Sequence, residues 1–140
     1  MFILKILFIF FICLNISFSY ASNIKNSAVV FMYHKFGVSK YPSTSVTMDQ
    51  FDAHLKEFSK KKYSLESIEF IMDIIINDGD LPNNTIGISI DDADKSFYEI
   101  GWPKFKENNI PVTLFVNTST IHENNKNYLN WNQIRKLRDE

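Results

Sequence analysis

Three short apolar segments, separated by helical patterns, constrain the fold of this chain most strongly. Each has the length and the content of β-branched and aromatic residues typical of a strand. They are residues 28–33 (AVVFMY), 85–91 (TIGISID) and 110–116 (IPVTLFV). Strands that alternate with helices form parallel sheets with right-handed crossovers. The sequence therefore predicts an α/β fold with parallel strands, and the first segment reads as a buried strand.

Helical patterns lie between these segments and after the last one. The first and the last begin with capping boxes, Thr47 with Gln50 and Asn130 with Gln133. The predicted helices cover residues 47–62, 67–77, 95–107 and 130–140. Residues 35–46, rich in turn-forming residues, are expected to form a functional loop.

The segment 85–91 alternates strictly, with Ile86, Ile88 and Ile90 on one face and polar or small residues on the other. Asp91 and Asp92 follow at its carboxyl end, where catalytic groups collect in α/β barrels. Two carboxylates that point differently suit two roles, one as a metal ligand and one as a base. The alternative is a pair of solvated loop acids stabilised by the next helix dipole.

The first 21 residues read as an export signal. Lys5 is followed by an apolar run, and Ser19-Tyr20-Ala21 offers small residues for cleavage after Ala21. The alternative is a retained membrane anchor, although polar residues interrupt the run. Cys13, the only cysteine, would leave with the signal. We therefore expect a secreted or periplasmic protein, with membrane contact only through an uncleaved signal.

Composition excludes some classes of protein. The chain has 140 residues, 15 basic against 16 acidic residues and 45% hydrophobic residues, so it is neither a typical nucleic-acid binder nor disordered. We therefore expect no nucleic-acid partner.

The stretch ISIDDADKSFYEIGWPKFKENNIPVTLFV resembles the first motif region of the polysaccharide deacetylases, the NodB-homology or carbohydrate esterase family 4 group. That family typically reads T-F-D-D-G, then a helix, then N-I-P-A-T-F-F-V. FMYHKFG, STSVTMDQFDAHL and YLNWNQIRKL resemble other parts of it. The resemblance implies a distorted (β/α) barrel and a hydrolase that removes acetyl groups from an acetylated polysaccharide, acting on an amide or an ester bond.

The resemblance also implies roles for single residues. Asp91 would be the catalytic base, and Asp92 the carboxylate ligand of a divalent metal, usually zinc. The family completes this site with two histidines from an H-x-x-x-H motif. His34, at the end of the first strand, and Asn117, after the third, are candidates to bind substrate. For His34 the alternative is a hydrogen-bonded core histidine.

Two departures from the family pattern stand out. Ala93 occupies the position of the glycine, which often supports a tight turn. No H-x-x-x-H occurs anywhere in the sequence. We therefore expect residues 22–140 to be the N-terminal part of a deacetylase domain, a barrel truncated before completion and inactive by itself. The alternative function is a non-catalytic exported module of the same fold that binds glycan.

Cleavage of the signal is testable. We expect N-terminal sequencing of the exported protein to begin at Ser22, because the small residues at positions 19 and 21 match a cleavage site. A mature protein that still carries Met1 would instead favour the anchor.

Overall fold

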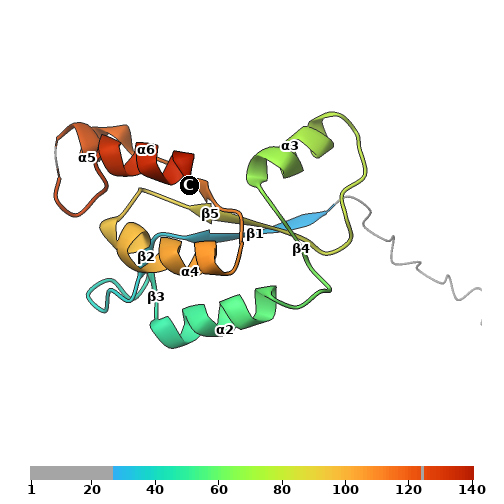
Figure 1. The fold of residues 1–140 in the computed structure, drawn as a ribbon, viewed down its shortest axis with the longest axis horizontal. Coiled ribbons are helices and arrows are strands. Elements are labelled where there is room, and N and C mark those ends of the chain that lie inside the picture. The colour runs from blue at the N-terminus through green and yellow to red at the C-terminus, as the bar shows by residue number, and fades with distance from the viewer. Residues whose placement is uncertain (1–26, 124) are drawn as a thin grey trace, which may run out of the picture.

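The computed structural model describes residues 27–123 and 125–140. The predicted signal segment and Cys13 lie outside the described residues. A four-stranded sheet forms the centre of the fold (Figure 1), and its strands are β1 (Ala28–Tyr33), β4 (Ser64–Glu66), β5 (Thr85–Ile90) and β6 (Thr113–Leu114). β5 pairs with each of the other three, and every pair is parallel. The predicted α/β fold with parallel strands is confirmed.

The remaining elements surround this sheet. A separate two-stranded parallel pair is formed by β2 (Lys35–Phe36) and β3 (Ser45–Val46). A π-helix, η1 (Phe97–Gly101), leads directly into α4. The α-helices are α2 (Met48–Phe58), α3 (Ile68–Ile76), α4 (Trp102–Glu107), α5 (Thr118–His122) and α6 (Trp131–Asp139). In Figure 1, α2 and α4 lie on one side of the sheet and α3 on the other.

Both predicted capping boxes are present. The Thr47 side chain accepts from the Gln50 backbone N–H, and the Gln50 side chain accepts in return from the Thr47 backbone. Asn130 and Gln133 form the same reciprocal pair at the start of α6. Each box satisfies two backbone donors that have no partner within a helix, so both helices begin where the sequence predicts.

The core is built largely from aromatic rings between the sheet and the α2–α4 side. Phe36, Phe51 and Phe105 are fully buried. The ring centroids of Phe36 and Phe51 lie 4.9 Å apart, and those of Phe51 and Phe105 lie 5.0 Å apart, both edge-on. Tyr33 stacks on Phe36 at 5.5 Å. These geometries are the favoured ones for aromatic pairs, so the end of β1 is held firmly against α2.

Two apolar faces are more exposed than the sequence predicts. β1 is an edge strand, and the side chains of Val29, Val30 and Met32 are 47–61% exposed, so the prediction of a buried strand is wrong. Within the described residues, β1 pairs only with β5. Val30 and Met32 lie on the face opposite to Phe31 and Tyr33, which meet α2, and Val29 shares the face of Phe31 and Tyr33 but lies before them, near the start of the strand. α3 likewise buries only Ile71.

Other boundaries also differ from the predicted ones. The third strand is limited to β6, and the helix expected over residues 95–107 is divided into η1 and α4. The expected loop 35–46 contains β2 and β3, while β4 and α5 were not predicted. β5 is buried on both faces, because α3 covers the face on which Gly87 lies. In the described part of the chain, no helix is long and apolar enough to cross a membrane.

Gly101 is expected to be intolerant of a larger side chain. A Cβ at this position would lie 3.0 Å from two carbon atoms of the Phe36 ring, which the surrounding aromatic rings hold in place. Overpacking costs about 1–3 kcal/mol, and the gain in helix propensity offsets about 1 kcal/mol of it. The net cost is about 0–2 kcal/mol. Because the Phe36 ring is held on several sides, we expect the upper half of this range, so Gly101→Ala should lower the free energy of unfolding, measured in urea, by about 1–2 kcal/mol.

The matched control is the same change in a Phe36→Leu background. Without the ring, the alanine should cost clearly less, because the two positions are in contact and their effects are not additive. A Gly101→Ala variant as stable as the parent protein would contradict this packing argument.

Candidate functional site

The carboxyl ends of three parallel strands meet at one edge of the sheet. Tyr33 of β1 pairs with Ile90 of β5, and Ile90 pairs with Leu114 of β6. Pairing continues one step further, because the Asp91 N–H donates to the Tyr33 carbonyl at 2.8 Å and the Phe115 N–H donates to the Ile90 carbonyl at 2.8 Å. His34 and Asp91 therefore leave neighbouring strands at the same level.

The turn after β5 has an unusual backbone. Asp92 and Ala93 both have left-handed conformations, with φ of 69° and 57°. The cost for a residue other than glycine is about 1 kcal/mol or more. The turn is held from outside, because the Leu129 N–H donates to the Ala93 carbonyl and the Lys95 N–H donates to the Asn127 carbonyl, both at 2.9 Å. The alanine therefore keeps the backbone conformation that a glycine would favour.

The two candidate carboxylates are available to a ligand. Asp91 and Asp92 are each half-buried. Neither side chain has a hydrogen bond or an ion pair with another residue in the described ranges. Two carboxylates without a protein partner at the mouth of a parallel sheet can accept protons or bind cations.

A third acid on the same turn has a different role. Asp94 is buried and forms an ion pair with Lys35 at 3.2 Å, with both side chains at most 14% exposed. Its Oδ1 accepts from the Ser96 hydroxyl at 2.6 Å and from the Ser96 N–H at 2.9 Å. The Ser96 hydroxyl oxygen accepts from the Phe36 N–H at 3.0 Å. This network fastens β2 to the turn that carries Asp91 and Asp92.

Sequence reasoning missed Lys35, Asp94 and Ser96. The spacing of Asp94 and Ser96 is typical of a turn in which an aspartate accepts from the backbone two residues on, so this part could have been recognised. The partner Lys35 lies 59 positions earlier, and no local pattern links it to Asp94.

The other predicted site residues, His34 and Asn117, lie outside this turn. His34 is half-buried and directly follows β1. Asn117 is exposed and caps α5, and its side-chain oxygen accepts from the Ser119 hydroxyl at 2.7 Å. The substrate-binding roles of both residues, and those of Asp91 and Asp92, stay predictions. His54, by contrast, bonds through Nδ1 to the Tyr33 hydroxyl at 2.8 Å within the core.

The described residues do not by themselves make a metal site. Across residues 27–123 and 125–140, no three histidine, cysteine, aspartate or glutamate side chains are grouped so as to hold an ion. Asp92 could supply one carboxylate, whereas a catalytic zinc normally has three protein ligands. The donor set therefore does not fit a complete zinc centre.

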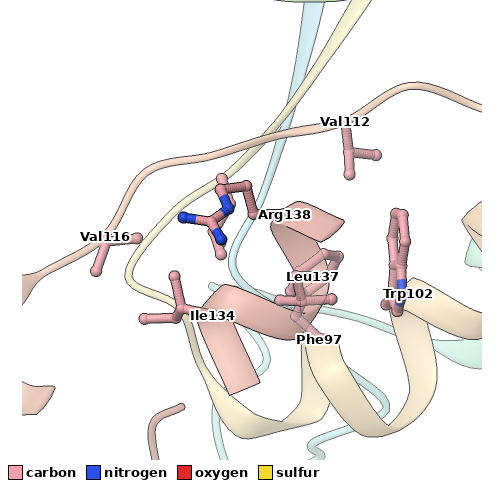
Figure 2. A pocket seen from close by; sticks show the side chains of 8 residues that line it. Phe97, Trp102, Val112, Val116, Ile134, Leu137 and Arg138 are labelled. Carbon is pink, nitrogen blue, oxygen red and sulfur yellow. The ribbon is translucent and has the colours of Figure 1, made fainter. Parts of the chain in front are cut away.

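An apolar pocket of about 320 Å³ lies apart from the acids. It is lined by Phe97 and Trp102, by the α6 side chains Ile134 and Leu137, and by Val112 and Val116, which flank β6 (Figure 2). The Trp102 indole N–H donates to Glu140 at 2.8 Å. The Trp102 ring also packs beside that of Phe97, with the ring centroids 6.4 Å apart.

Comparison with known proteins identifies relatives of this fold. No protein-family model matches the chain. A poly-beta-1,6-N-acetyl-D-glucosamine N-deacetylase of Staphylococcus aureus is 26% identical over 121 residues, which are 84% of this chain and 39% of that protein. The chain thus spans 39% of the length of the curated relatives it matches.

Solved structures of deacetylases also resemble this fold. A Streptococcus pyogenes deacetylase in complex with acetate superposes with a TM-score of 0.70 at 21% identity, over 83% of this chain and 53% of that one. A de-N-acetylase from Aggregatibacter actinomycetemcomitans also gives a TM-score of 0.70, at 18% identity, over 80% of this chain and 50% of that one. The resemblance to polysaccharide deacetylases and the predicted fold class are thereby confirmed, with part of their barrel represented here.

Zinc binding by the 140-residue chain tests the donor count. We expect a dissociation constant of about 1 mM or weaker, because one or two carboxylates offset little of the cost of dehydrating the ion. Calorimetric titration measures it directly. Micromolar binding that is lost in His34→Ala would show that a local histidine completes a site, contrary to this expectation.

Proposed function

We propose that this chain is part of an exported polysaccharide deacetylase that hydrolyses the acetamido groups of a β-linked amino-sugar polymer. The observation that carries the proposal is the convergence of His34, Asp91 and Asp92 at the carboxyl ends of paired parallel strands. The likeness to a Staphylococcus aureus poly-beta-1,6-N-acetyl-D-glucosamine N-deacetylase supports the choice of substrate class. The predicted N-terminal signal supports export.

Hydrolysis requires water to attack the acetyl carbon and the C–N bond to break, releasing acetate and the sugar amine. Asp91 is proposed as the base that accepts the proton of the attacking water. Its backbone is fixed by the hydrogen bond to the Tyr33 carbonyl, which keeps the carboxylate at a constant position at the strand end. A general base must stay within hydrogen-bond reach of the proton that it accepts. A residue whose backbone is held by sheet pairing keeps its position between turnovers.

Asp92 is proposed as a carboxylate ligand of a divalent metal. Because the backbone at Asp92 is left-handed, its side chain takes a different direction from the one it would have in a continuing strand. Because the described residues do not complete a ligand set, the other ligands would have to come from outside them. A non-catalytic glycan-binding module of the same fold is the second candidate, and whether the complete gene product supplies the other metal ligands distinguishes the two.

The two carboxylates should respond differently to substitution in the complete gene product. Asp91→Asn should lower turnover of an acetylated oligosaccharide about 10²- to 10⁴-fold, since it removes the base, and leave metal content unchanged. Asp92→Ala should lose the bound metal and the turnover together. Deacetylation rate and metal content are measured on the same preparations.

Asp49→Asn is the control, because Asp49 is an exposed acid in the first turn of α2 and does not belong to the turn after β5. Equal metal content in the parent and in Asp92→Ala would overturn the role of Asp92. A complete gene product that binds the oligosaccharide without ever releasing acetate would favour the glycan-binding module.

A further inference from the structure

A large cavity lies beside the proposed catalytic turn, and neither Asp91 nor Asp92 lines it. It has a volume of about 690 Å³ and is formed by three segments: residues 35–44, residues 94–100 and residues 126–128. Two of these segments continue directly from the strand ends, because Lys35 follows His34 and Asp94 lies two residues after Asp92. The cavity therefore adjoins the turn that carries Asp91 and Asp92, and we call it the lysine groove.

The lysine groove combines two tyrosines with a buried polar pair. The Lys35 ammonium lies 5.6 Å from the centre of the Tyr41 ring and 5.9 Å from that of Tyr128, so the two rings approach one cation from different segments. Asp94 completes the pair with Lys35 at 3.2 Å. Aromatic rings beside fixed donors and acceptors suit a sugar, which has apolar C–H faces and polar hydroxyl groups.

Charge determines which sugar fits best. Four lysines line the groove, against the two acids Asp94 and Glu99. Asp94 pairs with Lys35, and Glu99 pairs with Lys95 at 3.3 Å, so the charges of Lys40 and Lys126 are not balanced by these acids. Their positive potential repels a sugar that carries a free ammonium and tolerates an N-acetylated one, which is uncharged.

We propose that the lysine groove is a saccharide subsite that accepts an acetylated sugar next to the one being deacetylated and disfavours a neighbour whose amine is already free. This proposal rests on the proposed function for the position of the reacting sugar. It predicts that deacetylation is spaced along a polymer, since each new ammonium reduces binding of the adjacent repeat.

Binding is measured without turnover, by titrating the 140-residue chain with a β-linked N-acetylglucosamine tetrasaccharide and with its fully deacetylated counterpart. At mildly acidic pH, where the sugar amines are protonated, we expect the acetylated oligomer to bind at least about 5-fold more tightly. The charge-reversed double variant Lys40→Glu/Lys126→Glu should abolish or invert this preference. Equal affinity for the two oligomers in the parent chain would overturn the proposal.

Tyr128→Ala tests the location of the subsite and should weaken binding of the acetylated oligomer about 10-fold, because it removes one aromatic wall. Tyr63→Ala is the control. Tyr63 lies on the connection between α2 and β4, and its hydroxyl donates to the Glu57 carboxylate of α2. If Tyr128→Ala and the control bind alike, the sugar does not occupy this groove.

Discussion

In-register pairing of β1 with β5 is the constraint on which the other features of the site depend. All six residues of β5 are buried, and each is matched with a residue of β1, from Ala28 with Thr85 to Tyr33 with Ile90. The register sets the level at which His34 and Asp91 leave the sheet. A slip by one residue would turn Ile86, Ile88 and Ile90 away from the aromatic core, so burial fixes the register and therefore the site.

The turn that follows β5 is held in its conformation at several points. Two consecutive left-handed residues cost free energy, and they are held in place by backbone hydrogen bonds to Asn127, which accepts, and to Leu129, which donates, together with the Asp94 network. Buried ion pairs seldom add net stability, because desolvation offsets the attraction. The Lys35–Asp94 pair instead positions two segments relative to each other. The Ser96 hydroxyl donates to Asp94 and accepts from the Phe36 N–H, so β2 and the turn after β5 are held together.

Sequence patterns predicted the elements whose causes are local and missed those whose causes are distant. Capping boxes depend on residues three apart, so Thr47 and Asn130 could be identified directly. The exposed face of β1 depends on which strands lie beside it, and the segment AVVFMY contains no information about its neighbours. The acidic pair was found because it ends a strictly alternating strand, whereas the Lys35–Asp94 contact joins segments that only the fold brings together.

The ion pair also affects the two carboxylates proposed to act in catalysis. Lys35 follows His34 at the end of β1, one strand away from Asp91, so its ammonium is a cation at the same edge of the sheet. An ammonium paired closely with one carboxylate exerts a weaker net field on others nearby. By holding Lys35 at 3.2 Å, Asp94 leaves Asp91 and Asp92 without a cation from this position. Their charges are then not neutralised by Lys35, which a direct pairing with it would do.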